Sequence, residues 1–491
     1  MSSMHDLETR QYIGGEFVVG DAESIVVVNP ANDAVIASIS GASATLAMRA
    51  AEANSQAARD MKALPLLKRA ELVRRLALGI RMDAARLASI LTLESGKPIL
   101  ESRGEVEYAA SFFENAAAAA EMATGELPAS RMSDRRVLVL REPIGATVAI
   151  TPWNFPLAMI ARKFAPALAA GCSQVVKPAE ETPLAALAFA SIFEHCAHEV
   201  GAPAAAFSVV VGDPPTVAQA LIAHPSTRKL SFTGSTEVGR ILAAQCAPRL
   251  LKTALELGGN APFLVFADSD IDRAVEQAML SKFRFMGQTC ICANRFLLEQ
   301  SVAEEFLARL EVRVRALANM IGDPTLEFTR MGPLINDAAI EKVESHVADA
   351  VAHGAQLRVG GRRAEVAGLS RRFYEPTILS NCDPTMRCSR EETFGPVVAA
   401  MTFHSESEAI TMANAVPYGL AGYVMTQDAD RLLRVAEALD FGVIGANDGA
   451  PSTAEAPFGG RKDSGLGKEG GTHGLDAYTD LKYVSLRVRN C

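Results

Sequence analysis

The sequence predicts an α/β protein built on two parallel β-sheets. Between residues 147 and 256, short runs rich in β-branched residues alternate with helix-like stretches. Strands that alternate with helices form parallel sheets with right-handed crossover connections. A second alternating series extends from residue 261 to about residue 446. The length of 491 residues is sufficient for two or three domains with large cores of their own.

The segment before the first series is predicted to be helical and to be followed by an isolated strand. Residues 45–121 have a mostly helical pattern, which includes an alanine-rich run that favours a plain helix. Residues 136–141 have the pattern of a strand with polar ends, and residues 482–488 have the same pattern. Two such strands at distant positions pair either with each other or with another subunit.

The two series predict where a ligand would bind. Strands of the first are expected at residues 147–150, 174–176, 207–211, 229–232 and 252–255, with helices at 157–170 and 183–199. Strands of the second are expected at residues 263–266, 295–298, 397–403 and 443–446, with a helix at 271–285. Ligands of parallel sheets bind beyond the carboxyl ends of the strands. Three sharp turns lie there in the first series, at residues 151–154, 177–180 and 233–235.

Composition argues against several classes of partner. Apolar residues make up 49% and charged residues 21% of the chain, as in an ordinary globular protein. The net charge of -9 argues against nucleic acid or an anionic membrane as the main partner. No apolar run has the length of a membrane span, and residues 1–10 lack the apolar core of a signal peptide. Eight cysteines in so long a chain are no disulfide framework, which predicts a reducing compartment, the cytoplasm.

Cys290 is the candidate nucleophile. It follows a Gly-Gln-Thr turn that comes just after a helix-like segment rich in Phe and Met. A thiol on a turn can face a cleft, but the surroundings must be able to lower its pKa because the thiolate is the reactive form. A cysteine by itself is more often a small buried hydrophobe. Cys290 and Cys292 are spaced too closely for a zinc site, and no second Cys or His pair lies nearby, so no metal is expected.

Two turns carry groups that suit a dinucleotide. Lys177 could meet a phosphate or a ribose hydroxyl, and Glu180 could accept hydrogen bonds from both ribose hydroxyls. Gly234 and Ser235 lie at a predicted helix N-terminus, where free N–H groups can hold a pyrophosphate. The structural alternatives are a solvated turn and a plain Ser N-cap. The segment lacks the Gly-x-Gly-x-x-Gly fingerprint of a standard Rossmann fold.

Two acidic residues are further candidates. Glu256 ends a predicted strand and is followed by two glycines, which let the backbone turn and a ligand approach. An acid among apolar residues can have a raised pKa and act as a general base, although a structural salt bridge is the alternative. Glu392 precedes an aromatic turn at Phe394, where it provides either surface charge or a ribose contact.

Taken together, these motifs resemble the NAD(P)-dependent aldehyde dehydrogenase superfamily. They follow the order of that family over nearly the whole chain, in the segments 151–156, 177–180, 232–235, 255–259, 287–290, 392–396, 457–460 and 464–465. The resemblance implies that Cys290 is the nucleophile, Glu256 the base and Asn154 the oxyanion-hole side chain. It implies a dinucleotide site made of Thr151, Pro152, Trp153, Lys177, Glu180, Gly234, Ser235, Glu392 and Phe394.

The resemblance also implies a domain organisation. The fold expected is α/β and aldehyde dehydrogenase-like, with two Rossmann-like parallel-sheet domains and a small β arm for oligomerisation. Residues 1–125 and 144–258 would form the dinucleotide-binding domain, and residues 259–463 the catalytic domain. Residues 126–143 and 470–491 would be oligomerisation strands of a homodimer or homotetramer.

Within the superfamily, the sequence is most similar to succinate-semialdehyde dehydrogenases. The segments that carry this similarity are 159–163, 282–284, 290–295 and 455–460. In that subfamily two arginines and a serine bind the distal carboxylate of the substrate, which implies this role for Arg162, Arg284 and Ser452. Ordinary salt bridges of the arginines are the alternative. Phe285 stands where a polar residue often occurs, so it could narrow or dry the pocket, and it leaves the substrate's chain length open.

The implied reaction is NAD-dependent oxidation of succinate semialdehyde through a thiohemiacetal and a thioester on Cys290. Glu180 is expected to favour NAD because it would repel a 2′-phosphate, while Lys177 partly offsets that charge and keeps NADP open as a cofactor. The alternatives are oxidation of glutarate semialdehyde or another ω-carboxylate aldehyde, a catalytically silent homologue, and a thiol-redox or metal-binding protein. Cys292 forms a strained disulfide with Cys290, as in related enzymes, or it merely packs.

Overall fold

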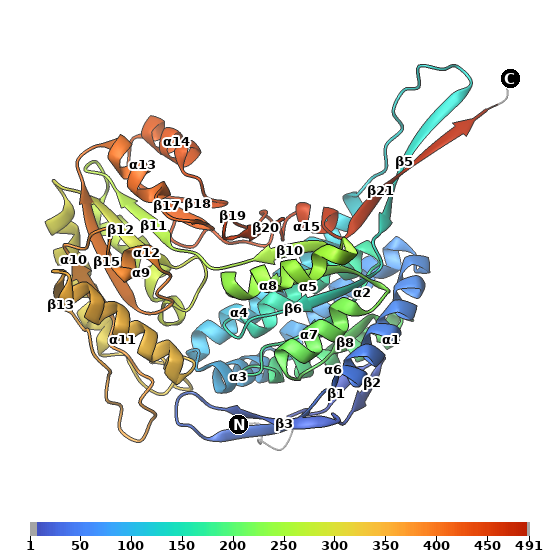
Figure 1. The fold of residues 1–491 in the computed structure, drawn as a ribbon, viewed down its shortest axis with the longest axis horizontal. Helices are drawn as coiled ribbons and strands as arrows, with labels where there is room; N and C mark the ends of the chain where they lie inside the picture. Colours follow the sequence, from blue (N-terminus) through green and yellow to red (C-terminus); the bar gives the residue numbers. More distant parts are fainter. Residues whose placement is uncertain (1–6, 489–491) are drawn as a thin grey trace.

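The computed structural model describes residues 7–488. Two β-sheets form the centres of two α/β units, and a long two-stranded ribbon projects away from them (Figure 1). The two alternating series in the sequence correspond to these two sheets, so the predicted α/β class is confirmed.

The first sheet has eight strands in the order β2-β1-β8-β7-β6-β9-β10-β20. The strands from β8 to β10 run parallel, and short antiparallel strands cover both ends of the sheet. At one end, Glu256 of β10 pairs with Gly465 of β20. The strands are β1 (Gln11–Ile13), β2 (Glu16–Val18), β6 (Ala146–Ile150), β7 (Ser173–Lys177), β8 (Phe207–Val209), β9 (Thr227–Thr233), β10 (Lys252–Glu256) and β20 (Gly465–Leu466).

Helices cover both faces of the first sheet, because alternate residues of a strand point to opposite sides. In β6, Ala149 packs into a core with α4, α5 and α6, whereas Val148 packs into a second core with α1, α7 and α8. The helical segment predicted for residues 45–121 is confirmed as four helices. The helices of this unit are α1 (Ala44–Ala63), α2 (Leu66–Met82), α3 (Ala84–Ser95), α4 (Ile99–Met122), α5 (Pro156–Ala170), α6 (Leu184–Val200), α7 (Pro214–Ala223) and α8 (Thr236–Cys246).

The second sheet has seven strands in the order β13-β14-β15-β12-β11-β17-β18, all parallel to their neighbours except β13. Its strands are β11 (Ala261–Val265), β12 (Ala293–Glu299), β13 (Gln356–Val359), β14 (Thr377–Ser380), β15 (Val397–Phe403), β17 (Ala421–Met425) and β18 (Val443–Ala446). Its helices are α9 (Ile271–Phe283), α10 (Ala303–Ala318), α11 (Asp337–Ala352), α12 (Arg387–Arg390), α13 (Glu406–Asn414) and α14 (Ala429–Ala438). No helix within residues 7–488 combines the length and the apolar character that crossing a membrane requires.

The helix predicted for residues 271–285 is shorter in the structure. Helix α9 ends at Phe283, and the short 3-10 turn η4 (Arg284–Gly287) follows it. Phe285 and Met286 have φ angles of 45° and 59°, which lie in the left-handed region where a right-handed helix cannot continue. The backbone N–H of Phe285 donates instead to the carboxylate of Glu101, at 2.8 Å. This break directs the chain after α9 into the turn that carries Cys290.

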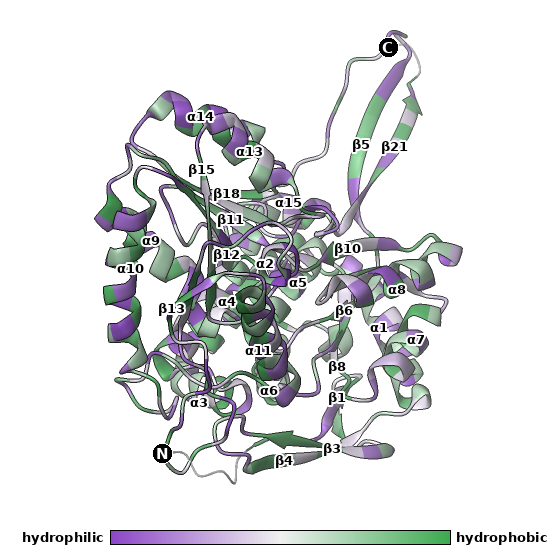
Figure 2. Ribbon diagram, turned by 60° about the vertical axis from the view of Figure 1, so that its left-hand side comes forward, coloured by the Kyte–Doolittle hydropathy of each residue, from purple (hydrophilic) through white to green (hydrophobic). Residues whose placement is uncertain are grey.

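The two isolated strands pair with each other. Strand β5 (Arg135–Pro143) and strand β21 (Thr479–Arg487) form an antiparallel ribbon that pairs Thr479 with Pro143 at one end. Leu481 and Tyr483 are largely exposed on this ribbon. Figure 2 shows hydrophobic positions along both strands, although the ribbon projects from the body of the protein. Smaller elements are β3 (Ala22–Val28), β4 (Val35–Gly41), β16 (Tyr418–Gly419), β19 (Arg461–Lys462) and α15 (His473–Asp476).

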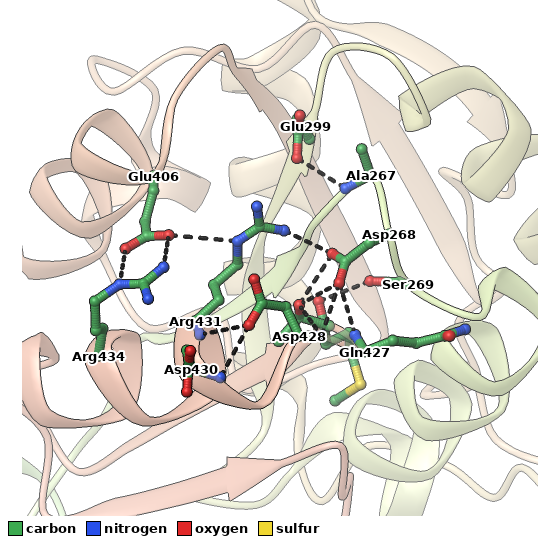
Figure 3. A network of polar contacts seen from close by, with 12 residues as sticks. Ala267, Asp268, Ser269, Glu299, Glu406, Gln427, Asp428, Asp430, Arg431 and Arg434 are labelled. Atoms are coloured by element: carbon green, nitrogen blue, oxygen red, sulfur yellow. Dashed lines mark hydrogen bonds and ion pairs between the residues drawn. The ribbon is translucent and has the colours of Figure 1, made fainter.

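A polar network fixes helices α13 and α14 against the second sheet (Figure 3). Arg431 of α14 donates to Asp268, at 2.7 Å, and to Glu406 of α13, at 3.3 Å. The carboxylate of Asp268 also accepts hydrogen bonds from the backbone N–H groups of Gln427 and Asp428. The loop after β11, the loop after β17 and both helices are therefore joined on one side of the sheet.

Candidate active site

A cavity of about 380 Å³ is lined by residues of both units. Most of the predicted site residues line it, namely Pro152, Trp153, Asn154, Arg162, Gly234, Ser235, Glu256, Arg284, Cys290, Glu392, Phe394 and Ser452. Thr151, Lys177, Glu180 and Cys292 are not part of its lining. Segments that are up to 350 residues apart in the sequence, from Tyr108 to Phe458, therefore converge on a single space, at the carboxyl ends of β6, β9 and β10.

The turn that carries Cys290 is held by hydrogen bonds on both sides of Ile291. The N–H of Cys292 donates to the carbonyl of Thr289 at 3.1 Å, and the hydroxyl of Tyr423 donates to the carbonyl of Ile291 at 2.6 Å. Gly287 has a φ of 73°, and a Cβ there would lie 2.4 Å from the carbonyl oxygen of Gly395, so only glycine fits. This geometry places Cys290 at the cavity and Cys292 behind it.

The surroundings of Cys290 raise its pKa instead of lowering it. Burial brings the pKa of the thiol to about 12, and the carboxylates of Glu392 and Glu256 add to the effect, while the guanidinium of Arg162 opposes it. Of these groups only Arg162 lowers the pKa, as a reactive thiolate requires.

Glu256, the candidate base, lines the same cavity as Cys290. It ends strand β10 and is only 2% exposed, and neither of its carboxylate oxygens has a hydrogen-bond partner among the described residues. Burial and the charge of Glu469 raise its pKa well above the ordinary value, against the opposing effect of Lys163. Glu256 forms no ion pair within residues 7–488, so the salt bridge that the sequence left open is not found there.

Asn154 lies beside the turn of Cys290. Its side-chain Nδ2 donates to the carbonyl oxygen of Gln288, at 2.9 Å, and Asn154 lines the cavity together with Cys290. A carboxamide nitrogen carries two N–H groups, so the second is free to donate to an oxygen in the cavity. The backbone N–H of Cys290 belongs to the same turn. The two groups have the character of oxyanion-hole donors.

The groups around the carboxyl ends of β6 and β9 fit a dinucleotide. The hydroxyl oxygens of Thr151 and Thr233 are buried and have no partner among the described residues. Ser235 caps helix α8, because its Oγ accepts from the N–H of Val238 at 3.3 Å, and it also lines the cavity. The N-cap interpretation of Ser235 is confirmed, and it does not conflict with a pyrophosphate site at the same helix N-terminus.

Lys177 and Glu180 form an ion pair with each other, at 2.6 Å. Lys177 is buried at the end of β7, and the side chain of Glu180 is partly exposed. In the turn of residues 177–180, the positive charge of Lys177 therefore lies beside the carboxylate of Glu180, which was expected to contact a ribose. Neither residue contacts the cavity itself, so a ligand that reached both would extend out of it.

Glu392 is held against the two glycines that follow Glu256. Its Oε1 accepts from the N–H of Gly259 at 3.0 Å, and a Cβ on Gly258 would lie 2.8 Å from its other oxygen. Burial raises the pKa of Glu392 to about 7, although the N–H of Gly259 opposes this. Phe394 stands edge-on to Trp153, with ring centres 5.5 Å apart, so the two predicted aromatic residues pack together beside the cavity.

Arg162 and Ser452 meet through a residue that the sequence did not single out. Arg162 of α5 donates to the hydroxyl of Tyr108 and, at 3.3 Å, to Ser452, and the two hydroxyls lie 2.7 Å apart. Tyr108 is an unremarkable position within the helical pattern of residues 45–121, so only the fold identifies it. Arg284 lies 5.0 Å over the ring of Phe155. In the described part of the chain neither arginine forms an ion pair, so the alternative of an ordinary salt bridge finds no support.

Phe285 and Cys292 lie outside the cavity. Phe285 is fully buried and packs edge-on against Trp153 and Phe155, so it does not narrow the cavity directly. The thiol of Cys292 lies 3.3 Å from the ammonium of Lys282, and both Cys290 and Cys292 are free thiols. No group of three or more His, Cys, Asp or Glu side chains within residues 7–488 is arranged to hold a metal ion.

Comparison with known proteins agrees with this geometry. Residues 17–484 match the aldehyde dehydrogenase family. Succinate-semialdehyde dehydrogenase [NADP(+)] of Escherichia coli (strain K12) is 44% identical, over 96% of this chain and 97% of its own length. Glutarate-semialdehyde dehydrogenase of Pseudomonas putida is also 44% identical, over 98% of both chains. The crystal structure of succinate-semialdehyde dehydrogenase from Burkholderia pseudomallei superimposes with a TM-score of 0.95, at 45% identity, over 99% of this chain and 100% of that one.

Proposed function

Because the chain belongs to the aldehyde dehydrogenase family, we propose that it oxidises succinate semialdehyde to succinate, with NAD as the preferred hydride acceptor. The observation that carries the proposal is that Arg162, Arg284 and Ser452 line the same cavity as Cys290. A substrate with a carboxylate at one end and an aldehyde at the other could place its carboxylate at the arginines and its aldehyde at Cys290. Succinate semialdehyde has this form.

The residues of the cavity account for each chemical step. The thiol of Cys290 loses its proton to solvent, and the thiolate adds to the aldehyde carbon to give a thiohemiacetal. Asn154 Nδ2 and the N–H of Cys290 donate to the oxygen that becomes negatively charged. A bound NAD(P) would supply the hydride acceptor, and the thiohemiacetal would become a thioester on Cys290 once its hydride is lost. Glu256 then activates the water that hydrolyses the thioester.

The arginines support an ω-carboxylate substrate over a neutral aldehyde. A buried guanidinium without a carboxylate partner is costly, and an anionic substrate would supply the missing partner bidentately. Arg162 is 3% exposed, and its Nε has no hydrogen-bond partner within residues 7–488. Glutarate semialdehyde is the second candidate, because a relative with that substrate name is as similar as the succinate-semialdehyde dehydrogenase of Escherichia coli.

The preference for NAD depends on Glu180. Its carboxylate can accept hydrogen bonds from both ribose hydroxyls, whereas the 2′-phosphate of NADP would bring a like charge against it. The Lys177 ammonium, 2.6 Å away, lessens that repulsion, so we propose preference and not exclusion. The Escherichia coli relative is named for NADP(+), so the ratio of kcat/KM for the two cofactors tests this preference.

We extend the proposal to the organisation of the chain. Residues 1–125 and 144–258 would bind the dinucleotide, and residues 259–463 would carry the nucleophile. Residues 126–143 and 470–491 would form an arm that joins subunits into a homodimer or homotetramer. Residues 1–6 and 489–491 of these ranges lie outside the described residues. Exposed apolar side chains on the ribbon, such as Leu481, support this role. The described cysteines are free thiols, which suits the reducing cytoplasm.

The experiment that tests the proposal is a panel of aldehydes with both cofactors. The rate of NADH or NADPH formation would be measured with succinate semialdehyde, glutarate semialdehyde and butanal. We expect the highest kcat/KM for succinate semialdehyde with NAD. Absence of reduced cofactor with every aldehyde would instead identify a catalytically silent homologue.

A further inference from the structure

An ion pair lies in the interior of the first unit, between Lys97 and Glu105. Lys97 is 1% exposed and Glu105 is fully buried. Removing two charges from water costs several kcal/mol per ion, and an apolar pair of similar volume is often at least as stable. Stability alone therefore gives no reason for this pair, whereas the contacts that each partner makes with neighbouring segments give one.

Lys97 contacts the loop that carries the oxyanion-hole amide. It lies between α3 and α4, and its ammonium donates to the backbone carbonyl of Asn154, at 2.8 Å. The same ammonium lies 3.9 Å from the ring of Phe155 and 4.6 Å from the ring of Phe285. One cation therefore touches Asn154, the residue after it and the start of the turn that leads to the nucleophile.

Glu105 contacts the beginning of helix α5. Its Oε1 accepts hydrogen bonds from the N–H groups of Leu157 and Ala158, at 3.0 and 3.2 Å. Helix α5 has no cap from a side chain at its own N-cap residue, Phe155, so the distant carboxylate takes that place. The segment between Asn154 and Ala158 is therefore held at both ends by one ion pair.

We propose that the Lys97–Glu105 pair positions the oxyanion-hole amide of Asn154. Lys97 of the pair donates to the backbone carbonyl of Asn154 and so holds its backbone. At the other end of the residue, Nδ2 of the Asn154 side chain donates to the carbonyl of Gln288 at 2.9 Å. With both ends held, the second N–H of the carboxamide has one direction, into the cavity. This inference rests on the proposed function, because that function gives Asn154 its role.

Two variants test the positioning. Glu105→Gln keeps an oxygen that can accept from α5 but removes the partner charge of Lys97, and Lys97→Met removes the bond to Asn154 while keeping the aliphatic stem. We expect kcat to fall about tenfold to hundredfold, as for a catalytic group displaced by about 1 Å. The burst of NADH in the first turnover should disappear, because hydride transfer follows oxyanion formation. The KM for NAD and the rate of Cys290 alkylation by iodoacetamide should stay within about twofold of wild type.

Glu94 provides a matched control. It is fully buried, and it accepts from the N–H groups of Leu184 and Ala185 at the start of α6, at 2.7 and 3.1 Å. Helix α6 contributes no residue to the cavity. Glu94→Gln should therefore lower the Tm as Glu105→Gln does and leave kcat unchanged. A kcat of Glu105→Gln equal to that of Glu94→Gln would overturn the inference.

The other possible results distinguish a failure of the positioning role from a failure of the proposed function. If Glu105→Gln does not fold, Lys97→Met is the variant that tests the inference, because it leaves the Glu105 cap of α5 in place. A wild-type kcat in Lys97→Met overturns the inference. Asn154→Ala is measured alongside. A wild-type kcat in Asn154→Ala would show that the oxyanion role is wrong, and with it the proposed chemistry. Loss of activity in Asn154→Ala with full activity in Lys97→Met would overturn the positioning alone.

Discussion

The ammonium of Lys177 donates to the carboxylate of Glu180 across a distance of 2.6 Å. Lys177 is buried at the end of β7, and Glu180 is partly exposed on the turn that follows. The buried cation orients the carboxylate and leaves its second oxygen to meet a ligand. A ribose would thus meet an acceptor that is already in place.

Glu180→Ser is expected to relax the preference for NAD. Removal of the carboxylate removes its repulsion of a 2′-phosphate, so the ratio of kcat/KM for NADP to that for NAD should rise about tenfold, which is ~1.4 kcal/mol. Steady-state rates at saturating aldehyde measure the ratio. Glu181→Ser, one residue further along the turn, is the control and should leave the ratio unchanged. A wild-type preference for NADP would contradict the role given to Glu180.

Cys290→Ala is expected to abolish turnover while cofactor binding, measured by fluorescence titration, stays largely intact. Glu256→Gln should slow thioester hydrolysis more than hydride transfer, so a burst of NADH would survive in the first turnover. Cys196→Ala, in α6 and away from the cavity, serves as the thiol control. Substantial steady-state activity in Cys290→Ala would rule out the nucleophile assignment.

Neutral substitution of Arg162 or Arg284 is expected to discriminate between aldehydes. Loss of a charge-assisted bond to the distal carboxylate should cost roughly 2–4 kcal/mol in kcat/KM for succinate semialdehyde. Butanal has no carboxylate and should lose little, which makes it the internal control. If both aldehydes lose activity equally, the arginines are structural.

The rate of thioester hydrolysis should depend on pH through the protonation state of Glu256. The pKa of Glu256 is raised by burial and by the charge of Glu469, and only its deprotonated form accepts a proton. The rate of thioester hydrolysis should therefore rise with pH through this raised pKa and level off above it, with the acidic side inactive. Single-turnover rates from pH 5 to pH 9 measure the profile. Glu256→Gln should remove the rising part, and an unchanged profile in that variant would assign it to another group.

Peroxide is expected to inactivate the enzyme reversibly, with recovery in dithiothreitol. A disulfide between Cys290 and Cys292 requires Cys292 to leave Lys282, from which it lies 3.3 Å. The bond would be strained and easily reduced. Mass spectrometry of the inactive protein should find a loss of two hydrogens in the peptide that contains both cysteines. Unchanged recovery in Cys292→Ala would show that a sulfenic acid on Cys290 is sufficient.

The sequence predicted the elements that depend on local pattern. Cys290 and Glu256 could be selected because each follows a strand or helix signal and carries a distinctive turn. Tyr108 could not, because its contact with Arg162 joins helices whose relative placement depends on the whole core. The pair of Lys97 and Glu105 was missed for a similar reason, since nothing in the spacing of two charges predicts that both are buried.

One expectation about the segment before Cys290 was wrong for a physical reason. The predicted helix to residue 285 could not anticipate that Phe285 adopts a φ of 45°, because that conformation is stabilised by the distant carboxylate of Glu101. The raised pKa of Cys290 could not be inferred from the sequence either, because the burial that raises it comes from segments far away in the chain. Contacts with residues far away in the sequence therefore determine the conformation of Phe285 and the pKa of Cys290, so the local sequence could not predict them.

The pairing of Glu256 with Gly465 has a consequence for biosynthesis. A ribosome releases Glu256 long before Gly465, so in the growing polypeptide the strand of the base keeps one edge open. Chaperones would therefore meet an uncapped sheet edge from the synthesis of residue 256 until that of residue 465. The edge beside Glu256 closes only after residues 465–466 have emerged.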